Sequence, residues 1–106
     1  MALAQLSQAD GSVKNRPVIL LRQMPPFGDW LVCGVSTQLH QRVAGFDELI
    51  EHSGPEFSRS GLKADSLIRL GYLAVLPVSD LRGAIGSISP ECHHRLLENL
   101  CRHLQC

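Results

Sequence analysis

The residues of this sequence that could act on a phosphate lie at the ends of two apolar runs. Arg16 comes directly before the run at residues 17–21, and a Ser-Thr-Gln triplet at residues 36–38 follows the run at residues 30–35. In an antiparallel hairpin, the start of the first strand lies beside the end of the second. A guanidinium would then lie near two hydroxyls and an amide, and its planar fork of N–H donors suits a phosphate. Lys14 would add positive charge at the same edge.

The same residue types also fit a purely structural role. An exposed arginine commonly pairs with a loop carbonyl, and Ser and Thr hydroxyls commonly form turns. Spacing alone therefore leaves two interpretations of Arg16 and its neighbours open, a phosphate site and an ordinary strand end.

Metal and thiol chemistry have weaker support. Cys92 and Cys101 lie about half a turn out of phase on a helix, so the two thiols cannot close one tetrahedral site from that helix. Cys33 stands inside an apolar run, where a thiol usually behaves as a small hydrophobic group. We expect the histidines to be packed or solvated imidazoles, with no metal bound and no cofactor required.

Acidic residues and glycines also lack the spacing of a catalytic motif. Asp47, Glu48 and Glu51 form a short acidic cluster, which is typical of a solvated face. Gly83 and Gly86 are too close together for a dinucleotide-binding fingerprint and more often mark bends in a strand.

Length and composition limit what these residues can belong to. The chain has 106 residues, 44% hydrophobic and 19% charged, and a formal net charge of zero. We expect one globular domain over residues 1–106. A zero net charge disfavours bulk coating of nucleic acid, although it allows a local phosphate site. The absence of an apolar run long enough for a membrane span, of a basic N-terminal region and of paired cysteines predicts a reduced, cytoplasmic protein without membrane contact.

The elements that would position these residues are mostly strands. The Met-Pro-Pro-Phe-Gly-Asp turn at residues 24–29 joins the two apolar runs into a hairpin whose first strand begins at Pro17. The polar segment 7–15 and the segment 53–61 are predicted loops. Further short strands are expected at residues 2–6, 46–50, 66–70, 73–78 and 84–88. The segments 66–70 and 73–78 form either one long bent strand or two short ones.

The C-terminus carries a clear helix signal. Ser89-Pro90-Glu91 supplies a capping hydroxyl, a proline for the first turn and an acidic residue at the positive end of the helix dipole. Leu96, Leu97, Leu100 and Leu104 then fall on one stripe. We predict an α-helix at about residues 90–104 packed on a small, strongly bent, mainly β barrel.

The ordered motifs resemble the MazF/PemK family of toxins from toxin–antitoxin systems. The family pattern is Gly-Ser, then Arg-Pro before an apolar strand, then a Thr-x-Gln or Thr-Thr-Gln triplet closing the next strand, and later an Asp-Ser before another strand. The segments of this sequence that match in order are Gly11-Ser12, Arg16-Pro17, Val35-Ser36-Thr37-Gln38, Asp65-Ser66-Leu67-Ile68 and Ile85 to Glu91.

The resemblance implies a small SH3-like barrel with a C-terminal helix that forms a homodimer. It implies a metal-independent endoribonuclease that cleaves single-stranded RNA by attack of the 2′-OH and is neutralised by a cognate antitoxin. Arg16 and Ser36 match the positions of the family's catalytic pair. The residues that would line the RNA groove are Ser12, Lys14, Thr37, Gln38 and Arg69.

Two departures from the family pattern keep other functions open. Ser36 stands where the family usually has a threonine, which keeps the hydroxyl but loses the methyl that stiffens its rotamer. Gly71 and Tyr72 stand where many relatives have a Glu-Gln pair that contacts RNA, so Tyr72 could stack on a base instead or Gly71 could mark a bulge. This change and the zero net charge favour an alternative, a catalytically inactive SH3-like barrel that binds RNA or a peptide. A third hypothesis is a dimeric structural subunit in which Phe27 and Trp30 serve packing or an interface.

Overall fold

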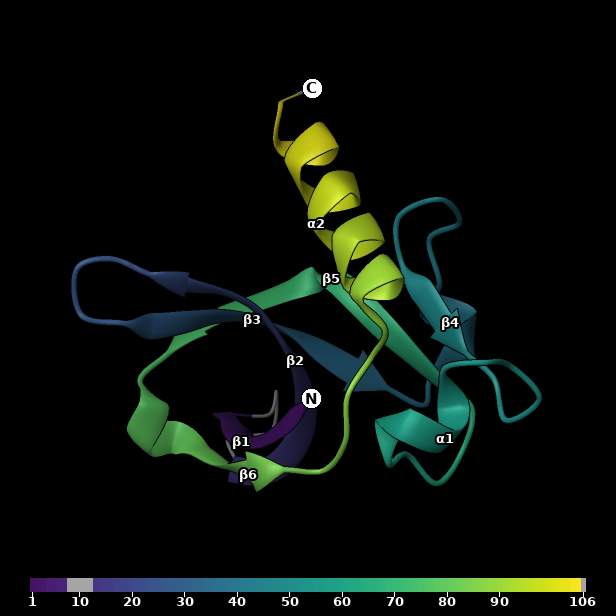
Figure 1. Ribbon diagram of the computed structural model, residues 1–106, viewed down its shortest axis with the longest axis horizontal. Coiled ribbons are helices and arrows are strands. Elements are labelled where there is room, and N and C mark those ends of the chain that lie inside the picture. Colours follow the sequence, from purple (N-terminus) through teal and green to yellow (C-terminus); the bar gives the residue numbers. More distant parts are fainter. Residues whose placement is uncertain (8–12, 106) are drawn as a thin grey trace.

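The chain folds into one curled antiparallel sheet with a helix at its C-terminal end (Figure 1). The structure is a computed structural model and describes residues 1–7 and 13–105. The strand order in the sheet is β4-β5-β3-β2-β1-β6. The elements are β1 (Ala2–Ser7), β2 (Val13–Met24), β3 (Asp29–Ser36), η1 (Leu39–Gln41), β4 (Glu48–Ile50), α1 (Phe57–Ser60), β5 (Ser66–Leu76), η2 (Val78–Asp80), β6 (Leu81–Ala84) and α2 (Pro90–Leu104).

The sheet bends into a half-barrel, which confirms the predicted mainly β fold. Figure 1 shows the curl, which is formed by β1, β2, β3, β5 and β6. The helix α2 stands outside this curl. In the described part of the chain, no helix is long and apolar enough to cross a membrane.

The hairpin of β2 and β3 is the centre of the sheet, as predicted. Its ladder runs from the pair Val18–Gly34 to the pair Met24–Asp29, which adjoins the turn. The Gly28 N–H donates a hydrogen bond to the Met24 carbonyl and closes this turn. The predicted start of the first strand at Pro17 was wrong, because β2 begins at Val13 and pairs with β1 from that residue onward. Pro17 has no N–H to donate, and the ladder to β3 begins only after it, at Val18.

Side chains alternate between two cores on opposite faces of this sheet. Ile19 and Cys33 face a core that includes Cys92, Leu96 and Leu100 of α2. Their neighbours on the other face form a second core inside the curl, made of Ala4, Val18 and Val32 with half-buried residues packed against them. Because strand side chains alternate in direction, every second residue of β2 and β3 belongs to the face away from α2.

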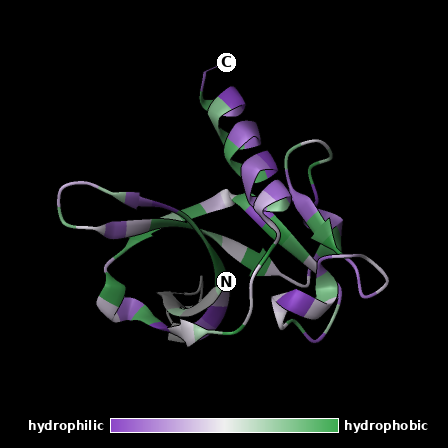
Figure 2. Ribbon diagram, in the orientation of Figure 1, coloured by the Kyte–Doolittle hydropathy of each residue, from purple (hydrophilic) through white to green (hydrophobic). Residues whose placement is uncertain are grey.

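The C-terminal helix forms as the sequence predicts. The hydroxyl of Ser89 accepts a hydrogen bond from the Cys92 N–H, and Pro90 opens the helix. Leu96 and Leu100 are buried, whereas Leu104 at the last turn is exposed, so the apolar stripe is used along only part of its length. Figure 2 shows hydrophilic residues along the side of α2 that faces the viewer.

β5 is one long strand, in agreement with one of the two predicted alternatives. It pairs with β3 along most of its length and with β4 near its start, in the pairs Glu48–Ile68 to Ile50–Ser66. The short pairing expected near residues 46–50 is therefore confirmed within narrower bounds.

Two short elements differ from their predicted positions. The segment 53–61, predicted as a loop, contains α1, which ends at Gly61 with a φ of 73°. The last strand, expected at residues 84–88, lies earlier as β6. The chain after β6 contacts α1 instead of extending the sheet. The Ser87 N–H donates to the Arg59 carbonyl at 2.8 Å, and a Cβ added to Gly86 would lie 2.2 Å from the Ser60 carbonyl oxygen. This close approach needs a glycine and binds α1 to the segment before α2.

Candidate nucleic-acid interface

Arg16 and Ser36 lie at the same end of the β2–β3 ladder and belong to the same face of the sheet. The β2–β3 ladder ends at the pair Val18–Gly34, and these two residues face the same side because directly paired residues of an antiparallel sheet do so. Arg16 lies two residues before Val18 and Ser36 lies two residues after Gly34. With a side-chain period of two, both belong to the face away from α2. Arg16 is exposed and Ser36 is half-buried, so both side chains flank the open end of the ladder.

A turn directly after β3 fixes the Ser36 hydroxyl oxygen. The backbone N–H of Gln38 donates to Ser36 Oγ at 3.0 Å, which is the geometry of a serine turn. The exposed Thr37 and Gln38 form this turn, and the chain continues into η1. Because a hydroxyl that accepts one hydrogen bond keeps its own proton, Ser36 can still donate to a ligand.

β5 brings Arg69 and Tyr72 to the same face. Arg69 pairs directly with Gly34 and is half-buried. A Cβ built on Gly34 would lie 3.2 Å from Cγ and Cδ1 of Tyr72, so the tyrosine ring lies against the backbone of Gly34 on the side where its side chain would project. We name the four residues Arg16, Ser36, Arg69 and Tyr72 the rim cluster.

Two other residues expected to line a groove, Lys14 and Ser12, are not part of the rim cluster. Lys14 belongs to β2, where its backbone pairs with Leu6 of β1. Ser12 lies outside the described residues. The rim cluster therefore combines two guanidinium groups, one hydroxyl and one aromatic ring on a single face. Guanidinium groups bind phosphates, and aromatic rings stack on bases, so this set of side chains suits single-stranded nucleic acid.

The buried cysteines are not poised as nucleophiles. Burial raises the pKa of the Cys33 thiol to about 12. Burial, together with the nearby Glu48 carboxylate, raises the pKa of the Cys92 thiol to about 12. Both groups therefore remain protonated at neutral pH, and the thiolate is the reactive form.

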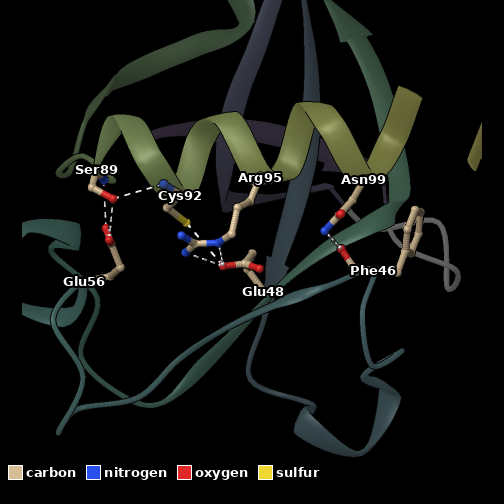
Figure 3. A network of polar contacts seen from close by, with 7 residues as sticks. All are labelled: Phe46, Glu48, Glu56, Ser89, Cys92, Arg95 and Asn99. Carbon is tan, nitrogen blue, oxygen red and sulfur yellow. Dashed lines mark hydrogen bonds and ion pairs between the residues drawn. The ribbon is translucent and has the colours of Figure 1, made fainter. Parts of the chain in front are cut away.

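A second polar cluster fastens the start of α2 to β4 and to the segment before α1 (Figure 3). Arg95 Nη2 donates to Glu48 Oε1 at 2.8 Å, and Cys92 Sγ donates to the same oxygen at 3.8 Å. Glu56 accepts the Ser89 N–H at 2.8 Å and the Ser89 hydroxyl at 2.5 Å. We name these five residues the helix clasp. Burial opposes ionisation of Glu56, but the two hydrogen bonds from Ser89 outweigh it and lower the pKa of the carboxyl.

Other imidazoles serve local contacts. His93 Nε2 lies 3.0 Å from the Leu20 carbonyl oxygen, and His52 Nδ1 lies 2.9 Å from Asp65 Oδ1. The backbone N–H of His52 donates to that carboxylate as well, and this bond is the main cause of the lowered pKa of Asp65. Within residues 1–7 and 13–105, no three histidine, cysteine or acidic side chains are grouped so that they could hold a metal ion.

Two buried residues near the rim cluster were missed by the sequence analysis. Asp47 was expected on a solvated acidic face, but it is only 6% exposed and accepts two backbone hydrogen bonds. Gly34 provides the space that the Tyr72 ring occupies. An acidic residue next to Phe46 and close to an apolar run was the available signal for Asp47, whereas nothing in the sequence marks Gly34.

Comparison with known proteins supports the fold. Neither a protein-family model nor a curated protein matches the sequence. Among solved structures, the chain is similar to the Mycobacterium tuberculosis toxin MazF-mt6, with a TM-score of 0.68 and 20% sequence identity. The similarity covers 99% of this chain and 97% of that chain. At this identity the likeness establishes a shared fold over nearly the full length of both chains.

Proposed function

We propose that this chain is the toxin of a toxin–antitoxin pair and a metal-independent endoribonuclease that cleaves single-stranded RNA. The observation that carries the proposal is the placement of Arg16 and Ser36 on one face at the open end of the β2–β3 ladder. The ordered motifs of the sequence and the fold shared with a toxin support the same function.

The proposed chemistry needs little from the protein because RNA carries its own nucleophile. The ribose 2′-oxygen attacks the adjacent phosphorus, and the bond from phosphorus to the 5′-oxygen breaks. The products are a 2′,3′-cyclic phosphate and a 5′-hydroxyl. Water takes the 2′-OH proton, and the solvent returns one proton to the departing 5′-oxygen. The protein positions the strand and stabilises the negative charge that grows on the phosphate.

Each proposed role follows from the chemistry of the side chain. Arg16 binds the phosphate and stabilises the developing charge, because a guanidinium keeps its proton at neutral pH and is a poor base. Ser36 donates its hydroxyl proton to a non-bridging oxygen or orients the 2′-OH. Arg69 contacts a neighbouring phosphate and Tyr72 stacks on a base. Lys14, Thr37, Gln38 and Ser12 belong to the proposed groove through the family resemblance.

The proposal includes two protein partners. A second copy of the chain completes a homodimer, and an antitoxin neutralises the toxin by covering the groove. The compartment we assign is the cytoplasm, where the RNA substrate is present.

One observation favours a second candidate function. The Ser36 oxygen closes the turn to Gln38, so this hydroxyl has a structural role that needs no catalysis. The second candidate is a barrel of the same fold that binds RNA or a peptide without cleaving it.

The two candidates separate in a cleavage assay with long single-stranded RNA in EDTA. We expect wild type to cut the RNA and Arg16→Ala to cut it at least about a hundredfold more slowly, which is the size of loss seen when one charge-stabilising donor is removed. Arg22→Ala is the matched control, because Arg22 is an exposed arginine of the same strand, paired with Leu31 away from the rim cluster. Full cleavage by folded Arg16→Ala would contradict the proposed site, and RNA binding without any cleavage would favour the second candidate.

A further inference from the structure

The ladder between β3 and β5 is interrupted beside the rim cluster. Cys33 pairs with Leu73, but the next residue of β3, Gly34, pairs with Arg69. Leu70, Gly71 and Tyr72 fall between these two pairs, so β5 carries a multi-residue bulge at this point. A bulge re-aims side chains and leaves backbone groups without their usual ladder partner.

Asp47 binds the first residue of the bulge from the β4 side of β5, because it directly precedes β4, whose Glu48 pairs with Ile68. Its Oδ1 accepts the buried N–H of Leu70 at 3.0 Å, at the start of the bulge. Its Oδ2 accepts the N–H of Val43 at 2.9 Å, within the loop before β4. The carboxylate thus joins the loop to the bulge with one oxygen for each. An acceptor with two charged oxygens fits two N–H donors, and a neutral amide has only one acceptor oxygen.

The bulge determines where the Tyr72 ring lies. Leu70 is fully buried on the face that α2 covers, whereas the Tyr72 ring lies against Gly34 on the opposite face. Tyr72 as a whole residue is 38% exposed, so part of its surface remains accessible to a ligand. Arg69 immediately precedes the bulge and pairs with Gly34. The same bulge therefore sets the position of the ring relative to Arg69.

We propose that Asp47 is a positioning residue for RNA binding: its carboxylate holds the β5 bulge so that the Tyr72 ring, seated on Gly34, forms a platform for one base. This inference rests on the proposed RNA-binding function and extends it to two residues outside the rim cluster. Asp47 touches no RNA and acts through Tyr72. Base stacking on this platform fixes which nucleotide lies beside Arg16 and Ser36.

The direction in which Asp47→Asn changes RNA affinity distinguishes a positioning role from an effect of the negative charge alone. Removal of a negative charge would by itself strengthen the binding of RNA. Asp47→Asn is expected to weaken it, because one of the two N–H donors loses its acceptor and the bulge shifts. Asp80→Asn is the matched control, since it removes the same charge from η2, away from the bulge.

The test is a double-mutant cycle on binding of a short mixed-sequence RNA whose 2′-oxygens are methylated to prevent cleavage. We expect Tyr72→Ala to lower affinity about tenfold, in line with one lost base stack, and Tyr72→Phe to retain it. Asp47→Asn is expected to lower affinity about threefold to tenfold in the presence of Tyr72 and to cause no further loss in the Tyr72→Ala background. Asp80→Asn should not lower affinity.

Two failures of this test are distinguishable. If wild type binds the RNA but Asp47→Asn binds equally well, or loses the same factor with and without Tyr72, the positioning role is wrong and the proposed function stands. If wild type does not bind single-stranded RNA, the proposed function fails and this inference fails with it.

A second variant, Gly34→Ala, keeps the proposal falsifiable if Asp47→Asn folds poorly. Tyr72 is the sole tyrosine of the chain, so its ring resonances can be followed without ambiguity. The Gly34→Ala substitution should displace the Tyr72 ring, because the added Cβ would lie 3.2 Å from two of its carbon atoms. We expect this variant to remain folded, to shift the Tyr72 ring signals and to lower RNA affinity. A folded Gly34→Ala protein with an unmoved ring or unchanged affinity would overturn the platform.

Discussion

The rim cluster and the helix clasp are both groups of polar side chains that meet from distant parts of the sequence, and they differ in how their polar atoms are used. In the helix clasp, the carboxylates of Glu48 and Glu56 accept hydrogen bonds from α2 and the residue that caps it. In the rim cluster, exposed Arg16 and half-buried Arg69 share a face with a hydroxyl and an aromatic ring. The clasp has a thiol and two acids, yet its geometry supports a structural role.

The difference teaches that reactive residue types alone do not identify a site. Cys92 is buried beside a carboxylate, and its raised pKa keeps the thiol protonated. Its hydrogen bond to Glu48 adds to the attachment of α2. Serine and arginine are less reactive side chains than a thiolate, but at the rim they can reach a ligand that brings its own nucleophile.

After the loss of cleavage expected for Arg16→Ala, the next largest expected effect is a loss of cleavage on substitution of Ser36. Ser36→Ala removes both the donor to the RNA and the acceptor of the Gln38 N–H, and we expect cleavage to fall about tenfold to a hundredfold. Ser36→Thr keeps the hydroxyl and should keep most of the activity. The measurement is the initial rate of RNA cleavage for both variants. Equal rates for alanine and threonine would show that the hydroxyl takes no part.

A smaller effect is expected when the helix clasp is opened at Ser89. Ser89→Ala removes the hydroxyl, and with it the cap of α2 and the side-chain hydrogen bond to Glu56, while the backbone N–H at this position still donates to Glu56. The free energy of unfolding should therefore fall by about 1–2 kcal/mol. Cleavage per folded molecule should remain that of wild type. Urea unfolding measures the first quantity, and the cleavage rate at low urea measures the second. A normal stability with lost cleavage would place function in the clasp.

The smallest expected effect is a pH dependence from Glu56. Its pKa is lowered in the folded protein, so its contribution to stability is present above its unfolded value of about 4.5 and is lost as pH falls through the folded pKa. Glu56→Gln should therefore be less stable than wild type near neutral pH. The difference should shrink as pH falls below about 4.5. Unfolding midpoints at several pH values measure it; a difference that persists or grows in acid would contradict the role of the ionised carboxylate.

Much of the fold follows from local signals in the sequence. The Ser89-Pro90-Glu91 cap and leucine stripe predicted α2, and the turn at residues 24–29 predicted the β2–β3 hairpin. Strand ends were less predictable, since Pro17 lies inside β2, where its missing N–H falls outside the β3 ladder. The position of β6 depended on the backbone contact of Gly86 with α1, which no local pattern records.

The candidate site was predictable only in part. The types and spacing of Arg16 and Ser36 pointed to one end of the hairpin, because antiparallel pairing brings those ends together. The position of Tyr72 over Gly34 could not be predicted, since it depends on a bulge held by Asp47 from outside the strand. Asp47 itself looked like part of a solvated charge cluster, and its burial is a property of the tertiary structure.

The most direct test of the account measures RNA cleavage and urea unfolding together on Arg16→Ala and Ser89→Ala. The account predicts that Arg16→Ala, at an exposed residue, stays folded and loses at least about a hundredfold in cleavage rate, while Ser89→Ala loses stability and keeps its cleavage rate per folded molecule. A folded Arg16→Ala protein that cleaves RNA at the wild-type rate would contradict the assignment of the site to the rim cluster.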